Sequence, residues 1–182
     1  MLEDRLLIWK LRQNRPEALQ RLYEKYKNAL LKLAVVLCSD VNTAEDVVQD
    51  VFISFAGSAR RIRPIGNPKK YLMTCVANRI RNIKRDEKRH KTSDIEASDV
   101  LISGSKRPEQ WAILSEQLQI LSSAMSQIPR NQREVIALYM QGNMNFRQIA
   151  KMQDTPASTA RVRYNKGMNT LRALLNSEVE KE

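Results

Sequence analysis

Two consecutive stretches decide the fold: residues 42–58 read NTAEDVVQDVFISFAGS, and residues 67–89 read NPKKYLMTCVANRIRNIKRDEKR. In the first stretch, apolar residues recur at three- and four-residue steps, which is the spacing of one face of an α-helix. The second stretch keeps the helical period but carries lysine and arginine at most of its other positions. A helix with an acidic face, followed by a helix with a basic face, is therefore the predicted centre of the fold.

The exposed side of the first helix is expected to be acidic. Its buried stripe is predicted to contain Ala44, Val47, Val48, Val51, Phe52 and Phe55. Asp46, Gln49 and Asp50 lie on the opposite face, with the two aspartates one helical turn apart. That face is either a solvated acidic surface or a docking surface for a basic protein partner. Asn42 or Thr43 is the expected N-cap.

The second helix and the segment before it are strongly basic. Residues 57–67 are predicted to form a loop that holds Arg60, Arg61 and Arg63. The helix that follows is expected to bury an apolar stripe and to expose an excess of cations too lopsided for pairing within the helix. The whole chain has a formal net charge of +11. This charge layout favours contact with a nucleic acid, because cations release condensed counterions from phosphates.

Composition limits the fold class and excludes several functions. The chain of 182 residues has only 5 glycines and 6 prolines, which favours helices over strands joined by turns. No apolar run approaches the roughly 20 residues of a membrane-spanning helix, so we expect no membrane insertion and a cytoplasmic location. Cys38 and Cys75 are expected to be buried free thiols. With His90 as its one histidine and no metal-ligand spacing, phosphate loop or nucleophile motif, the chain is predicted to be no enzyme and to need no cofactor or metal.

Helical patterns continue on both sides of the central stretches. Residues 2–11 predict a short first helix with Leu6, Leu7 and Leu11 on one side, and a longer helix follows up to residue 38. From residue 92 to residue 107 the pattern dissolves into small polar residues that are typical of a linker. We therefore predict an all-α protein of two small helical domains, residues 1–91 and 108–182, joined by a flexible linker at residues 92–107.

The C-terminal part contains a helix-turn-helix pattern. A short helix over residues 146–152 is predicted to be followed by a tight turn and a last helix from residue 157. Ala150 is small enough for the crossing point of the two helices. The second helix of such a motif exposes polar and basic residues near its N-terminal end for the major groove. The candidates here are Ser158, Thr159, Arg161, Arg163 and Lys166.

Together these motifs resemble the sigma-70 family of bacterial transcription initiation factors, in particular its small extracytoplasmic-function (ECF) type. The string AEDVVQDVF at residues 44–52 is similar to the family's helix that binds core RNA polymerase. Residues 71–85 resemble the helix that recognises and melts the −10 promoter element. Residues 128–135, 146–150 and 158–159 resemble the domain that reads the −35 element. The resemblance covers nearly the whole chain, in the family's order and spacing.

The resemblance implies a role for each matching position. Asp46, Gln49 and Asp50 would contact core RNA polymerase. The −10 element and the melted strand would be met by Arg60, Arg61, Arg63, Asn78, Arg79 and Arg85, with a flipped base received by the 57–67 loop. The −35 element would be met by Ser158, Thr159, Arg161, Arg163 and Lys166. Members of the ECF type are often held inactive by an anti-sigma factor, and the sequence leaves the existence of one open.

Some positions depart from the family pattern, and one alternative function stays open. The family usually has tryptophan where Tyr71 stands, and glycine in the helix-turn-helix turn where Asp154 stands, although aspartate tolerates a left-handed conformation better than most residues. The alternative is a stand-alone operator-binding regulator that uses only the helix-turn-helix. The acidic helix argues against it, because such a regulator needs no basic protein partner there. Promoter sequence, inducing signal and the orientation of the two domains are not predicted.

Overall fold

The structure, a computed structural model, describes residues 2–58, 66–93 and 116–179, and every regular element in those ranges is a helix. The N-terminal helices are α1 (Leu2–Arg12), α2 (Pro16–Cys38), α3 (Val41–Ser58) and α4 (Pro68–Ser93). The C-terminal helices are α6 (Glu116–Ser126), α7 (Arg130–Met140), α8 (Phe146–Met152) and α9 (Ala157–Val179). The all-α prediction is confirmed. The predicted start of the C-terminal domain at residue 108 and most of the predicted linker lie outside the described residues.

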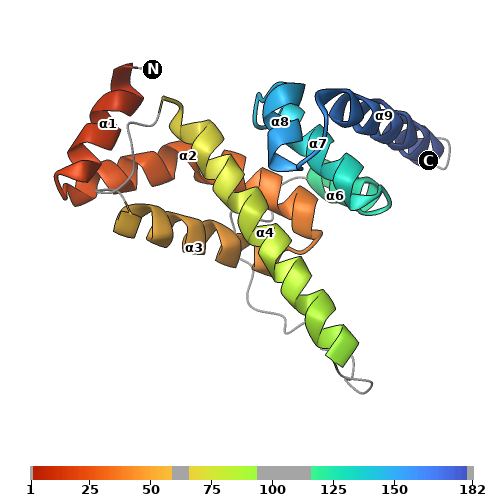
Figure 1. The fold of residues 1–182 in the computed structure, drawn as a ribbon, viewed down its shortest axis with the longest axis horizontal. Helices are drawn as coiled ribbons and strands as arrows, with labels where there is room; N and C mark the ends of the chain where they lie inside the picture. The colour runs from red at the N-terminus through yellow and green to blue at the C-terminus, as the bar shows by residue number, and fades with distance from the viewer. Residues whose placement is uncertain (1, 59–65, 94–115, 180–182) are drawn as a thin grey trace.

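Helix α2 is the centre of the N-terminal half. It packs against α1, α3 and α4. Figure 1 shows α4 crossing α2 and α3 and extending beyond them. Leu22, Leu30 and Leu33 of α2 are completely buried. Each such leucine contributes roughly 1.5–3 kcal/mol of hydrophobic free energy. The predicted apolar stripe of α3 is buried in full, and this leaves the opposite face of α3 outward.

Two local expectations were wrong. Helix α3 begins at Val41, and its cap is Asp40, whose carboxylate accepts a hydrogen bond of 2.7 Å from the Thr43 backbone N–H. The helix therefore starts before Asn42. In α1, Leu7 and Leu11 are buried as expected, but Leu6 is 49% exposed, because the buried face of this short helix is completed by Ile8 instead.

The C-terminal helices form the predicted helix-turn-helix and a support for it. Helix α9 packs against α6, α7 and α8. Gly167 allows α9 to lie close to α7, because a Cβ at this position would come within 2.7 Å of Ile136 Cδ1. The rings of Tyr139, Phe146 and Tyr164 join α7, α8 and α9, with centroids 4.8–5.5 Å apart. The motif is thus held on a rigid helical base.

The N-terminal and C-terminal helices pack against each other. Helix α2 contacts α6 and α7, and Figure 1 shows α6–α9 gathered beside α2 and α4. At this junction Arg133 of α7 donates a hydrogen bond of 3.1 Å to Ser39 Oγ, and others to the carbonyl oxygens of Ser126 and Ile128. Burial lowers the pKa of Arg133. The sequence did not predict this closed arrangement.

Candidate nucleic-acid and protein interfaces

The polar face of α3 is exposed as predicted. Asp46, Gln49 and Asp50 all lie on the surface of the helix, one turn apart or less. Ile53 shares this face and is 71% exposed, although it is a large apolar side chain. The face therefore combines two carboxylates, an amide and an apolar side chain, a set suited to docking a protein that offers cations around an apolar contact.

Asp50 is engaged within the chain. Its Oδ2 accepts hydrogen bonds from Arg79 Nη2 at 2.8 Å and Nε at 3.2 Å, across the gap between α3 and α4. The two side chains are half exposed, at 50% and 49%. The pair thus joins one residue predicted to bind polymerase to one predicted to bind DNA. Asp46 has no such ion pair among the described residues.

A groove of about 460 Å³ runs between α3 and α4 next to this ion pair. Tyr71 and Asn78 of α4 line it together with Phe55 of α3. Tyr71 also packs its ring at 5.8 Å from that of Phe55, so the aromatic position that departs from the family pattern still supports the helix pair. The groove places an amide beside aromatic surface, which is a suitable lining for a nucleobase.

The remaining basic positions of the N-terminal half divide into two groups. On α4, Asn78, Arg79 and Arg85 are exposed as predicted. Arg60, Arg61 and Arg63 lie outside the described residues. The structure therefore brings the α4 positions together along one helix and leaves the loop arginines as predictions.

The start of α8, and the turn that joins α8 to α9, have the geometry that a helix-turn-helix requires. Asn145 Oδ1 accepts a hydrogen bond of 2.9 Å from the Gln148 backbone N–H, and Gln148 Oε1 accepts one of 3.1 Å from that of Asn145, which fixes the start of α8. Asp154, which stands where the family usually has glycine, takes the left-handed conformation with φ 50°. Ala150 is buried at the crossing with α9.

The five predicted −35 residues on α9 differ in their exposure to solvent. Ser158, Arg161 and Lys166 are exposed, and Thr159 and Arg163 are partly buried. The Arg161 guanidinium lies 5.7 Å from the centre of the Phe146 ring, which holds it over the start of α8. The N-terminal half of α9 thus presents hydroxyl and guanidinium groups on one side of the motif.

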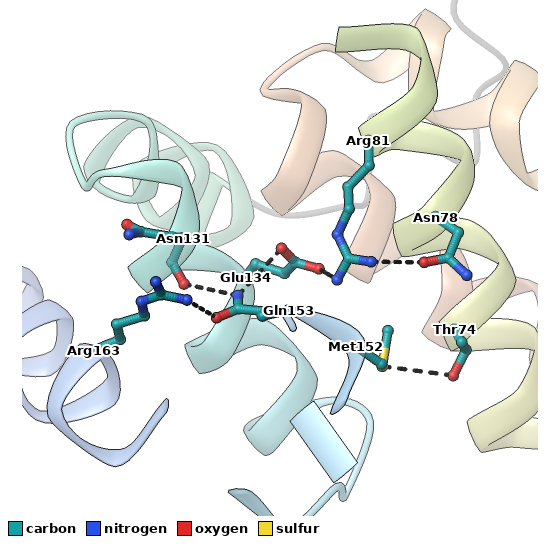
Figure 2. Close-up of polar contacts among 8 residues, drawn as sticks. All are labelled: Thr74, Asn78, Arg81, Asn131, Glu134, Met152, Gln153 and Arg163. Carbon is teal, nitrogen blue, oxygen red and sulfur yellow. Dashed lines mark hydrogen bonds and ion pairs between the residues drawn. The ribbon is translucent and has the colours of Figure 1, made fainter. Parts of the chain in front are cut away.

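Arg163 is engaged in a chain of polar contacts that reaches α4 (Figure 2). Arg163 Nη1 donates to Gln153 Oε1 at 2.7 Å, and Gln153 Nε2 donates to Glu134 Oε2 at 3.3 Å. Glu134 Oε1 accepts from Arg81 Nη2 of α4 in an ion pair. We call Arg81, Glu134, Gln153 and Arg163 the α4–α9 bridge. Its one acidic member is almost completely buried, with 8% of its side chain exposed.

Several of these residues were missed by reading the sequence. Ile53 could have been found, because it stands three residues after Asp50 and therefore on the acidic face. Arg81, Glu134 and Gln153 gave no such signal. The contact of Arg81 with Glu134 joins positions 53 residues apart, and helical periodicity carries no information about such a pairing.

Both cysteines are partly shielded from solvent. Cys38 and Cys75 are free and partly buried. Burial raises the pKa of Cys38 to about 11 and also raises the pKa of Cys75. Both thiols are therefore protonated near neutral pH and are poor nucleophiles.

An all-helical fold that contains a helix-turn-helix is typical of DNA-binding proteins, and comparison with known proteins gives the family of this chain. The sigma-70 region 2 profile matches residues 22–90, and the sigma-70 region 4 profile matches residues 118–171. The chain belongs to the sigma-70 family of RNA polymerase sigma factors and is of the ECF type. That family consists of transcription factors that are not enzymes.

Individual relatives agree with this assignment. The chain is 24% identical to the probable RNA polymerase sigma factor RfaY of Xanthomonas campestris pv. campestris, over 86% of this chain and 40% of RfaY. It is also 24% identical to the ECF RNA polymerase sigma factor ShbA of Streptomyces griseus subsp. griseus, over 71% of this chain and 70% of ShbA. The chain therefore spans less than half the length of RfaY but most of ShbA.

A solved structure shares the fold. The sigma factor RpoE of Bartonella quintana, crystallised in complex with the anti-sigma factor NepR, superposes with a TM-score of 0.67 at 23% identity, over 86% of this chain and 96% of RpoE. No described helix of the present chain is both long and apolar enough to cross a membrane.

Proposed function

We propose that this chain binds core RNA polymerase, directs it to promoters with −35 and −10 elements, and assists in opening the DNA. The observation that carries the proposal is the presence, in one chain of the sigma-70 family, of an exposed acidic face on α3 and a helix-turn-helix with exposed polar and basic residues on α9. The chain would catalyse no reaction itself and would act in the cytoplasm, where a bacterium keeps its polymerase and chromosome.

Each half of the chain would have its own task. Residues 1–91 would bind polymerase and the −10 element, residues 108–182 would read the −35 element, and residues 92–107 would link them. The match of the two family profiles to residues 22–90 and 118–171 supports this division.

The polymerase contact would lie on α3. Asp46 and Asp50 would pair with cations of the partner, Gln49 would form hydrogen bonds with it, and Ile53 would supply an apolar contact at the end of the same face. Charge-assisted hydrogen bonds across an interface contribute to affinity as well as to the rate and specificity of association, and an apolar residue beside them excludes water.

The DNA contacts would lie on α4 and α9. Asn78, Arg79 and Arg85 would meet the −10 region together with Arg60, Arg61 and Arg63. Ser158 and Thr159 are suited to contacts with base edges, and the cations Arg161, Arg163 and Lys166 to contacts with guanine or phosphate. An anti-sigma factor is a further proposed partner, since RpoE of Bartonella quintana was crystallised with one.

The alternative, an operator-binding regulator without polymerase contact, is not favoured. It requires nothing of residues 22–90 beyond dimerisation or sensing, whereas those residues match the sigma-70 region 2 profile.

Gel filtration with core RNA polymerase tests the proposal. We expect the wild-type chain to co-elute with the polymerase, and the Asp46→Lys/Asp50→Lys variant to elute alone. The matched control is Glu17→Lys/Glu24→Lys, which makes the same change of net charge on exposed positions of α2 and is expected to co-elute. A wild-type chain that elutes alone would refute the polymerase contact.

A further inference from the structure

Helix α1 carries apolar side chains on two opposite faces. Its inner face is buried in the core and consists of Leu7, Ile8 and Leu11. Its outer face consists of Leu2, Leu6 and Trp9, which are 83%, 49% and 54% exposed. These three residues follow one another at steps of four and three, so they form one row along the helix. We call Leu2, Leu6 and Trp9 the outer stripe.

The outer stripe is uncovered in the part of the chain that the structure describes. Helix α1 packs against α2, and Figure 1 shows it at the opposite end of the molecule from α9. No other described helix exposes as many large apolar side chains. A single exposed apolar residue is ordinary on a soluble protein, but a helix that is apolar on all sides is normally buried. A row of three on the free side of a helix therefore points to a binding partner.

Both acidic residues of α1 are paired with a cation of α2. Lys25 Nζ donates to Glu3 Oε2 at 2.5 Å and to Asp4 Oδ1 at 2.8 Å. Tyr26 OH donates to the same oxygen of Asp4 at 2.7 Å. These contacts hold one side of α1 against α2, and this turns the outer stripe away from the protein. They also balance the two negative charges of the helix, so the other charged side chains of α1 are all cations.

Those cations border the outer stripe on both sides. In helical projection, Arg5 and Arg12 lie along one border, and Lys10 lies along the other, on the same side as the paired Glu3. None of the three cations forms an ion pair with a carboxylate of the described residues. The outer side of α1 thus has an apolar centre and positively charged borders.

The positive border on the Lys10 side continues towards α2. A groove of about 430 Å³ beside Trp9 is lined by Lys10, Arg15 and Arg21. Among the described residues, Glu17 is the one acid in this lining. The whole chain has a formal net charge of +11. The surface around the outer stripe therefore attracts anions.

An anionic lipid surface fits this arrangement. Helices that lie in the plane of a membrane place leucine and tryptophan at the boundary of the acyl chains and lysine and arginine near the headgroups, and tryptophan is enriched at that depth. A second copy of this chain fits less well, because pairing two outer stripes would bring cations against cations. An acidic protein is a weaker candidate, because the stripe is a raised row on one helix and not a groove that would hold a partner helix.

We propose that the outer stripe and its bordering cations bind an anionic lipid surface, with α1 lying in the plane of the headgroups. This contact needs no spanning helix, and no described helix is long and apolar enough to be one. One short helix buries few apolar side chains, so the binding is reversible. The inference goes beyond the proposed function and does not depend on it, because α1 carries none of the residues assigned to polymerase or DNA.

Co-sedimentation of the whole 182-residue chain with vesicles tests the proposal. We expect the wild type to pellet with vesicles of phosphatidylglycerol and phosphatidylethanolamine, and to stay in solution with vesicles of phosphatidylcholine, which carry no net charge. In a Trp111→Phe background, Trp9 is the one remaining tryptophan. Its fluorescence emission should shift to shorter wavelength on the anionic vesicles only, because the indole ring leaves water.

Substitutions in the outer stripe test the apolar contact. Leu6→Ser and Trp9→Ser should each weaken vesicle affinity by about tenfold or more, which is the factor expected when one large apolar side chain is no longer buried. The matched control is Met140→Ser on α7, which also replaces an exposed apolar side chain, with 62% of the residue exposed. It should bind the vesicles like the wild type. Circular dichroism checks that each variant is folded.

A second pair of variants tests the bordering cations. Arg5→Gln/Arg12→Gln should weaken binding to the anionic vesicles by about tenfold or more, because each cation near a charged membrane adds to the attraction. Arg147→Gln/Arg172→Gln removes the same charge from exposed positions of α8 and α9 and should have a much smaller effect.

A wild-type chain that stays in solution with the anionic vesicles would overturn the proposal and leave the outer stripe to a protein partner. Leu6→Ser and Trp9→Ser variants that bind as tightly as the wild type would also overturn it, because binding would then rest on net charge alone. Equal losses for the two arginine pairs would overturn the assignment of the bordering cations. The proposed function fails in a different measurement, the co-elution of the wild-type chain with polymerase.

Discussion

Asp50 offers a direct way to separate docking from internal structure, because it is predicted to bind polymerase and is also paired with Arg79. The perturbation is Asp50→Asn, which removes the charge and keeps the shape. Both members of the pair are about half exposed, and exposed ion pairs contribute about 0.2–1 kcal/mol to folding. For a chain of this length the melting temperature should therefore fall by less than about 4 °C.

The effect on polymerase affinity should be much larger. A hydrogen bond to a charged group contributes about 1.5–3 kcal/mol, which corresponds to a loss of roughly 10- to 150-fold in affinity. Fluorescence anisotropy of the labelled chain, titrated with core polymerase, measures it. Asp46→Asn, on the same face without an ion pair to α4, should lose a similar amount of affinity and no stability.

Arg79→Gln is the decisive control. If Asp50 serves only to orient Arg79, then Arg79→Gln and Asp50→Asn will weaken polymerase binding equally. We expect instead that Arg79→Gln leaves polymerase affinity within about threefold of the wild type, since half a kcal/mol is the scale of a surface pair, and that it impairs promoter opening. Equal losses for the two variants would refute a direct contact by Asp50.

Three further predictions concern local structure. Asp40→Ala should lower the free energy of unfolding by about 1 kcal/mol through loss of the α3 cap. Partial burial alone would raise the pKa of Asp40, but hydrogen bonds from Thr43 and neighbouring backbone groups hold the pKa below its usual value. The stabilisation is therefore complete above the unfolded-state pKa of about 3.9 and is lost as the pH falls through the folded-state pKa, so urea titrations of both proteins at several pH values should show the difference disappear in acid. Gly167→Ala should destabilise the protein by up to about 2 kcal/mol, because the added Cβ would lie 2.7 Å from Ile136 and 3.1 Å from Gln132, and this crowding outweighs the gain in helix propensity. The control is Gly57→Ala, where a Cβ would meet nothing within 4 Å. Equal thermal stability of the two variants would contradict this packing. Cys38 should react with iodoacetamide about 200-fold more slowly at pH 8 in the folded protein than in urea, because its pKa is raised to about 11 from a reference near 8.5 and the thiolate fraction falls accordingly. Alkylation followed by mass spectrometry measures this, and equal rates would show that the thiol is not shielded.

The sequence predicted the helices well, because each is encoded by apolar residues at local spacings that its own neighbours satisfy. The buried stripe of α3, the exposed Asp46 and Asp50, and the left-handed Asp154 all follow from short-range patterns of this kind. The cap of α3 was misplaced because Asp40, Asn42 and Thr43 are all good capping residues, and only the backbone geometry decides among them.

The packing of the two halves could not be predicted in the same way. Arg81 appeared as one more cation on a basic helix and Glu134 as one more acid on a predicted helix. Their ion pair forms only because α7 packs against α2, and this packing joins residues that are far apart in the sequence. The residues with the clearest local pattern were thus assigned from sequence, and those that join the halves were not.

The most direct test of the central claim is transcription in vitro with core polymerase and genomic DNA of the source bacterium, followed by sequencing of the transcript 5′ ends. We predict that adding the chain creates a reproducible set of start sites that share two upstream sequence blocks at a fixed spacing. Asp46→Lys/Asp50→Lys should abolish all of these starts. If the start sites were the same with and without the chain, a role as sigma factor would be contradicted.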